Sequence, residues 1–172
     1  MSLLYQLRRA VLQCSDPNLL VAQALDRSLS LVGGEFGNLQ LLDTAGDSLK
    51  IVAHNGFKAE FLAYFADVKD DRSACGRAAM RGVQTVIEDV NVDEAFAPHR
   101  EVAADSGFRA VQSTPIIDFS GQLLGVISTH YRNRHRPTRT ELQMIGHYAG
   151  MVGEALSRHH SSDRAGLASS AV

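Results

Sequence analysis

The spacing of apolar residues changes from helical to alternating and back to helical along the chain, and this order is the strongest constraint on its fold. Val21, Leu25 and Leu29 recur at steps of four, which places them on one face of a helix. Residues 36–55 instead follow a period of two, as half-buried strands do. Helical spacing returns after Thr138. The pattern predicts helices at both ends of the chain around a sheet-forming middle.

Capping residues predict where the two long helices begin and end. Asp16 can cap a helix that carries Pro17 in its first turn, and Gly33 ends that helix. The last helix opens with Thr138 and Glu141 at the spacing of a capping box. Both helices therefore have local signals that agree with their apolar spacing.

The segments between these helices read as strands interrupted by short helices. The expected helices cover residues 3–14, 17–32, 58–66, 74–81 and 98–107, with a last helix after residue 138. The expected strands cover residues 36–43, 48–55, 83–90, 109–117 and 122–131. This order predicts an α/β (α+β) fold, in which an antiparallel sheet of five or six strands has small helices inserted in its middle.

Composition and charge exclude several classes of function. The chain has 17 basic and 19 acidic side chains and a formal net charge of −2, which gives no electrostatic case for binding nucleic acid or an anionic membrane. No apolar run approaches the roughly 18 residues that span a bilayer. The N-terminus does not read as a secretory signal, and two separated cysteines form neither a disulfide framework nor a zinc pattern. We expect a cytoplasmic protein without a metal.

The ordered motifs "GNLQLLD", "IVAHNGF", "SACGRA", "VIEDV" and "VQSTPI…GQLLGVISTHY" resemble the GAF domain family. The predicted organisation is an N-terminal helix over residues 1–16, the GAF domain over 17–158 and a disordered tail or linker over 159–172. The resemblance implies an α/β/α sandwich with the terminal helices on one face of the sheet and a small-molecule cavity over the other. It further implies a sensory or regulatory module in signal transduction, whose ligand and cofactor the fold does not name.

Cys75 decides between a sensor and an enzyme. In one enzymatic GAF subgroup, the free methionine-(R)-sulfoxide reductases, the motif around a working cysteine resembles "ACGRAA" here. That chemistry needs a second thiol within bonding reach, but Ala104 occupies the comparable position and Cys14 lies in the first helix.

The sequence leaves three possible roles for the Cys75 side chain: a reactive thiol, a cofactor anchor or a small buried residue. Cys75 can be reactive because the helix N-terminus, Arg72 and Arg77 are expected to lower its pKa. Packing as a small hydrophobic residue is the alternative. A tetrapyrrole is not expected, since the resemblance to bilin-binding members implies histidine after the anchoring cysteine and Gly76 stands here.

The alternation of side chains along three strands predicts a ligand site. Residues two apart on a strand share a face, and polar pairs that meet at the sheet centre need partners or a cavity. Aromatic residues and Cys75 of the inserted helices are expected to close the site. The predicted ligand-binding residues are Asn38, Gln40, Phe61, Phe65, Cys75, Gln112, Thr114, Ser128 and His130.

The last helix carries two apolar rows, and one sheet surface does not cover both. The rows are Leu142, Ile145, Ala149, Val152 and Leu156, and Met144, Tyr148, Met151 and Ala155. We therefore predict a homodimer through the terminal helices. For the function, we predict a noncatalytic sensor coupled to an output domain such as a histidine kinase or cyclase. The alternatives are a thiol oxidoreductase of the sulfoxide reductase class and a ligand-free dimerisation module.

Overall fold

The computed structural model describes residues 2–43 and 45–169, which form a five-stranded antiparallel sheet between two helical layers. The strands are β1 (Phe36–Leu42), β2 (Leu49–Asn55), β3 (Thr85–Ile87), β4 (Ala110–Ile117) and β5 (Leu123–Tyr131). Their order in the sheet is β2-β1-β5-β4-β3. The predicted α/β/α fold is confirmed, although only three residues of the predicted strand over 83–90 pair within the sheet.

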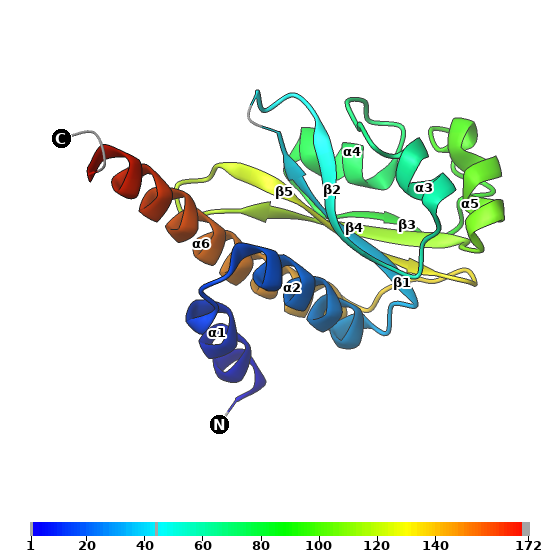
Figure 1. Ribbon diagram of the computed structural model, residues 1–172. Coiled ribbons are helices and arrows are strands. Elements are labelled where there is room, and N and C mark those ends of the chain that lie inside the picture. Colours follow the sequence, from blue (N-terminus) through cyan, green and yellow to red (C-terminus); the bar gives the residue numbers. More distant parts are fainter. Residues whose placement is uncertain (1, 44, 170–172) are drawn as a thin grey trace.

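The helices of the two chain ends share one face of the sheet, and the inserted helices cover the other (Figure 1). The first layer holds α1 (Leu3–Gln13), α2 (Pro17–Val32) and α6 (Arg139–Ser169). The second holds α3 (Ala59–Tyr64), α4 (Ala74–Arg81), the short 3-10 helix η1 (Ala97–His99) and α5 (Arg100–Ser106). Among the described residues, no helix is both long and apolar enough to cross a bilayer.

The predicted caps form as expected. Asp16 Oδ1 accepts a hydrogen bond from the Asn18 backbone N–H at 2.9 Å, and Gly33 ends α2 in the left-handed conformation with φ 62°. Thr138 and Glu141 make a reciprocal capping box, in which the Glu141 N–H donates to Thr138 Oγ1 at 3.2 Å and the Thr138 N–H donates to Glu141 Oε2 at 2.6 Å.

Helix α6 differs from two expectations. The helix continues to Ser169, where the sequence predicted that a disordered tail or linker begins at residue 159, and residues 170–172 lie outside the described part. The second apolar row does not require a second chain either, because Tyr148 and Ala155 are buried in a cluster that α1 and α2 share. The physical reason is that α1 and α2 cover the side of α6 that the sheet leaves free.

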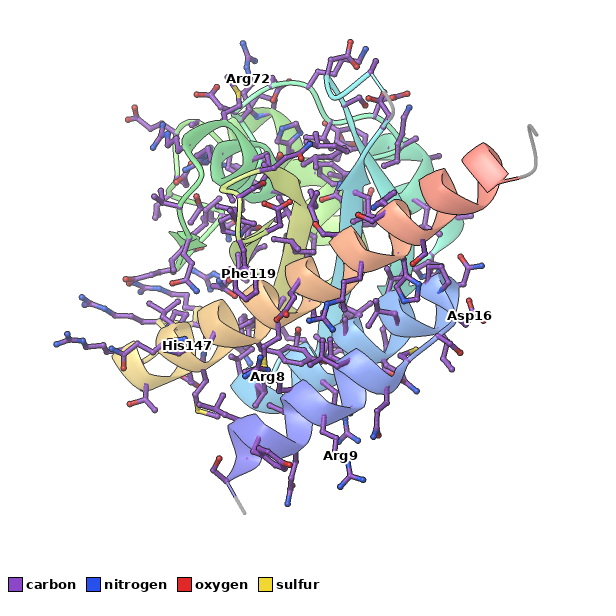
Figure 2. The ribbon with its side chains drawn as sticks, turned by 90° about the vertical axis from the view of Figure 1, so that its left-hand side faces the viewer. Arg8, Arg9, Asp16, Arg72, Phe119 and His147 are labelled. Carbon is purple, nitrogen blue, oxygen red and sulfur yellow. The ribbon has the colours of Figure 1, made fainter. Side chains whose placement is uncertain are left out.

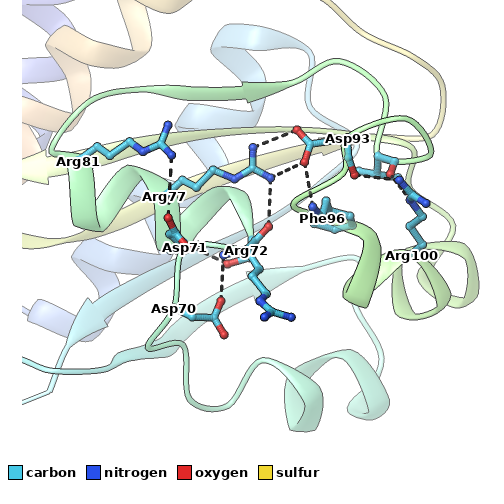
Figure 3. Close-up of polar contacts among 11 residues, drawn as sticks. Asp70, Asp71, Arg72, Arg77, Arg81, Asp93, Phe96 and Arg100 are labelled. Carbon is cyan, nitrogen blue, oxygen red and sulfur yellow. Dashed lines mark hydrogen bonds and ion pairs between the residues drawn. The ribbon is translucent and has the colours of Figure 1, made fainter.

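A largely buried ion pair fastens the loop after β3 to α4. Arg77 donates to both carboxylate oxygens of Asp93, at 3.0 and 2.7 Å, and to the Arg72 carbonyl oxygen at 3.1 Å (Figure 3). The Asp93 carboxylate also accepts from the Phe96 backbone N–H at 2.9 Å, and Arg100 donates to the Asp93 carbonyl at 3.0 Å. These bonds hold Phe96 and α5 over the sheet.

The substitution Asp93→Ala is expected to lower the free energy of unfolding by about 3 kcal/mol at neutral pH, because it leaves the buried Arg77 guanidinium unpaired. Asp71→Ala is the matched control, since Asp71 pairs with Arg81 at 4.0 Å and both side chains are more than half exposed. The control is expected to change stability by less than about 0.5 kcal/mol. Urea denaturation of the two variants measures the difference.

This stabilisation also has an expected pH dependence. The hydrogen bonds from Arg77 lower the pKa of the Asp93 carboxyl group. A carboxyl group whose pKa falls on folding stabilises the protein above its unfolded pKa of about 3.9, and that contribution disappears as pH falls through the folded pKa. The stability difference between wild type and Asp93→Ala should therefore shrink below about pH 4. A difference that stays constant into strong acid contradicts this account.

Candidate functional site

A small cavity lies between the centre of the sheet and the layer of inserted helices. Its space is about 20 Å³, enough for about one water molecule. Strands β1, β4 and β5 supply its floor, and α3, α4 and the segment around α5 supply its walls. The residues that line it are Asn38, Gln40, Phe61, Phe65, Ser73, Ala74, Cys75, Phe96, Phe108, Val111, Ser128 and His130.

Four buried polar atoms of this floor have no hydrogen-bond partner among the described residues. They are Asn38 Oδ1, Gln40 Oε1, Gln40 Nε2 and His130 Nδ1. The three side chains belong to residues that are 3%, 0% and 4% exposed, respectively. An unpaired polar group this deep lowers stability by about 1–3 kcal/mol, so a site where four of them converge is unusual for a purely structural core.

Seven of the nine predicted site residues line this cavity, and Gln112 and Thr114 do not. The register of the β4–β5 pair gives the reason. Gln112 lies opposite Thr129 and Ser113 lies opposite Ser128, and residues directly opposite each other in an antiparallel pair share a face. Val111 and Ser113 therefore face the cavity side of β4, although Gln112 and Thr114 are the more polar pair.

Gln112 and Thr114 instead belong to a hydrogen-bonded chain on the terminal-helix face. Gln112 Nε2 donates to Thr114 Oγ1, and Thr129 Oγ1 donates to Gln112 Oε1 at 3.2 Å. Gln84 Nε2 donates to Thr114 Oγ1 at 3.1 Å and to the Leu142 carbonyl oxygen of α6 at 2.8 Å. These polar groups have the partners that the cavity groups lack.

The sequence prediction missed several walls of the cavity, chiefly Phe96 and Phe108. Both are aromatic residues at the borders of the expected helix over 98–107, and this position is the signal that could have identified them. Phe108 packs edge-on against His130, with ring centroids 4.6 Å apart. Aromatic side chains thus close the cavity opposite its polar floor.

Cys75 is a buried thiol with little thiolate character. Burial raises the pKa of Cys75, and its hydrogen bond with Ser73, at 3.2 Å between Sγ and Oγ, offsets this only in part. The expectation of a lowered pKa is wrong, because burial dominates and neither arginine is directed at the sulfur. Arg77 binds Asp93, and the Arg72 side chain extends from the outer surface (Figure 2).

Cys14 and Cys75 lie on opposite sides of the sheet. Cys14 packs against the cluster of the terminal helices, whereas Cys75 belongs to the cluster of the cavity layer. A disulfide needs Cα atoms within about 7 Å, so these two thiols do not form one within the folded chain. Ala104, where the sulfoxide reductase resemblance implies a cysteine, is exposed on α5.

Gly76 allows the loop before α4 to cross closely over the helix. A Cβ atom at this position would lie 1.8 Å from the Asp70 carbonyl oxygen, so no larger residue fits without moving the loop. The structure therefore gives a packing reason for the glycine that follows Cys75. Among the described residues, no group of three or more His, Cys, Asp or Glu side chains could hold a metal ion.

A search of solved structures finds the same fold in proteins of low sequence identity. The free methionine-R-sulfoxide reductase of Neisseria meningitidis is 19% identical with a TM-score of 0.76, covering 92% of this chain and 89% of that chain. A domain assigned to a two-component sensor histidine kinase of Sinorhizobium meliloti is 18% identical with a TM-score of 0.74, covering 88% and 97%. At these identities the similarity establishes the fold alone.

Sequence comparison identifies the family. The methyl sulfide methyltransferase-associated sensor of Methanosarcina acetivorans is 27% identical over 96 residues, which cover 56% of this chain and 10% of that protein. The chain thus spans about a tenth of the length of this relative. The model of the GAF domain family matches residues 14–157. This chain belongs to the GAF domain family.

Proposed function

We propose that this GAF domain is a noncatalytic sensory or regulatory domain that binds a small molecule in the cavity between the sheet and the inserted helices. The observation that carries the proposal is the set of four partnerless polar atoms of Asn38, Gln40 and His130. A bound ligand can satisfy these atoms and recover the free energy that their burial costs. Membership of the GAF family and the similarity to a protein named as a sensor support the same role.

Strand β5 provides a direct mechanical link from the cavity to the terminal helices. Ser128 and His130 line the cavity, while Thr129 and Tyr131 point to the opposite layer. Tyr131 Oη donates to the carbonyl oxygen of Val32, the last residue of α2, at 3.1 Å. A ligand that shifts β5 would thereby bias the position of α2, which is how we propose that binding reaches an output domain, such as a histidine kinase or cyclase.

The arrangement of thiols argues against the sulfoxide reductase alternative. A catalytic cycle of that type needs a thiolate nucleophile and a resolving thiol nearby. Cys75 is buried with a raised pKa, and the only other cysteine, Cys14, lies beyond the sheet. The chain has no internal second thiol that could resolve an oxidised Cys75.

A ligand-free dimerisation module is the second candidate, favoured by the small cavity of about 20 Å³. Four large apolar side chains of α1 and α2 are exposed and are available for pairing with a second chain. They are Leu3, Leu4, Tyr5 and Leu19. Dimerisation through the terminal helices is compatible with both candidates, whereas ligand binding separates them.

Native mass spectrometry of the freshly purified protein tests ligand binding, with two glutamine variants as a matched pair. Wild type is expected to carry a bound small molecule that Gln40→Met loses and Gln112→Met retains. Both glutamines are buried, but only Gln112 has hydrogen-bond partners. Gln112→Met should therefore lower the free energy of unfolding by about 1–3 kcal/mol, and Gln40→Met by less than about 1 kcal/mol. A wild-type mass equal to that of the polypeptide favours the ligand-free module.

Reduction of free methionine sulfoxide tests the noncatalytic assignment. With thioredoxin or dithiothreitol as reductant, the wild-type protein is expected to show no turnover above the rate of the reductant alone, because Cys75 has no resolving partner. Cys75→Ser is the control for any background rate. Turnover in wild type that disappears in Cys75→Ser would falsify the noncatalytic assignment.

Light scattering tests the proposed dimer. Wild type is expected to be a dimer at a protein concentration of tens of micromolar, a range in which even an interface of modest size holds two chains together. Tyr5→Glu should weaken the dimer without unfolding it, because Tyr5 is exposed on α1. Val92→Glu, at an exposed apolar position outside the terminal-helix layer, should leave the dimer intact. A wild-type monomer, or equal effects of the two substitutions, contradicts the proposed interface.

A further inference from the structure

The cavity carries no net charge, which restricts the ligands it can take. None of the described residues that line it is an aspartate, glutamate, lysine or arginine. Its two titratable groups are neutral at pH 7, since burial raises the pKa of Cys75 and lowers the pKa of His130 to about 3. Arg77, two residues after Cys75, turns to Asp93 instead of the cavity (Figure 3). A charged ligand would lose its hydration here without gaining a counter-charge.

The partnerless atoms present a specific pattern of donors and acceptors. Asn38 Oδ1 and Gln40 Oε1 accept hydrogen bonds, Gln40 Nε2 donates them, and His130 Nδ1 does either according to its tautomer. Asn38 and Gln40 are two residues apart on β1, so both amides point from the same face. A complementary ligand has at least two N–H donors next to one acceptor, as in a primary amide.

Most of the remaining lining is apolar and aromatic, and the hydroxyl groups of Ser73 and Ser128 already have partners in Cys75 and Ser113. Phe61 and Phe65 lie on the α3 side with ring centroids 4.8 Å apart, and Phe96 and Phe108 complete the wall with centroids 6.4 Å apart. This wall suits a hydrocarbon group and offers no hydrogen bonds. The ligand therefore needs a polar end for the strand floor and an apolar end for the phenylalanines.

We propose that the cavity recognises an uncharged ligand through an amide-like edge, in which N–H donors adjoin a carbonyl acceptor. The inference rests on the proposed function of this cavity as the ligand site, and it adds the chemical class of the ligand. The amide edge binds Asn38 and Gln40, and the apolar part of the ligand packs against the phenylalanines. Anionic and cationic relatives of the same shape are rejected because nothing in the lining balances their charge.

Three molecules of nearly the same shape test this inference: acetamide is neutral, acetate is an anion and acetamidinium is a cation. Each has only four heavy atoms, but the cavity of about 20 Å³ holds about one water molecule, so binding requires the phenylalanine wall to move outward. The full-length ¹⁵N-labelled protein is titrated with each at pH 7, and the side-chain amide resonances of Asn38 and Gln40 are followed. Acetamide should give saturable shifts with a millimolar Kd, as expected for so few atoms. Acetate and acetamidinium should bind at least tenfold more weakly.

Two variants place the binding event within the cavity. Gln40→Met should weaken acetamide binding at least tenfold, whereas Gln112→Met, on the other face of the sheet, should leave it unchanged. The backbone resonances outside the cavity report that each variant is folded. Acetamide binding that is insensitive to Gln40→Met would show a surface site and overturn the inference.

The remaining outcomes distinguish an error in the proposed ligand class from an error in the proposed ligand-binding function. If acetate or acetamidinium binds as tightly as acetamide and depends on Gln40, the neutral class is wrong while the cavity remains a ligand site. If acetamide produces no saturable shift, the amide-edge inference is wrong, and the molecule retained in native mass spectrometry decides independently whether the cavity binds a ligand at all.

Discussion

The antiparallel register of β1, β5 and β4 is the constraint on which the rest of this structure depends. Ser128 on β5 pairs with Asn38 on β1 along one edge and with Ser113 on β4 along the other. One row of side chains therefore crosses three strands on the cavity face. The row one residue away, with Thr129 opposite Gln112, crosses the same strands on the terminal-helix face. A shift of one residue in either pair would exchange the two rows. The position of the cavity and the anchoring of the helices therefore have a common origin.

The two faces of the sheet differ in how many of their buried side-chain polar atoms have hydrogen-bond partners. On the terminal-helix face, Gln84, Gln112 and Thr129 share hydrogen bonds that end on the backbone of α6. On the cavity face, Asn38 and Gln40 keep polar atoms without partners in the described chain. Satisfied groups fix the packing of helices on the sheet. Unsatisfied groups hold free energy that a ligand can recover, which is the physical basis of the proposed sensor.

The wall of the cavity is held by contacts that do not touch the cavity itself. The ion pair between Arg77 and Asp93 fastens α4 to the segment that carries Phe96. Gly76 lets the preceding loop approach the helix closely. Arg77 thereby orders the wall and leaves the lining uncharged. The burial of Cys75 in this packing also raises the pKa of its thiol, which disfavours the reactive thiolate form.

The sequence alone determined the elements and their local chemistry. Apolar periodicity predicted the helices and strands, and the caps at Asp16 and Thr138 formed as their residue types required, because these signals act within a few residues. Alternation also placed Asn38 with Gln40 and Ser128 with His130. Tertiary structure decided which face of β4 joined them, since register depends on partner strands. It also decided that α1 and α2 bury the second face of α6. Pairing and burial are set by residues distant in the chain, and no local pattern encodes them.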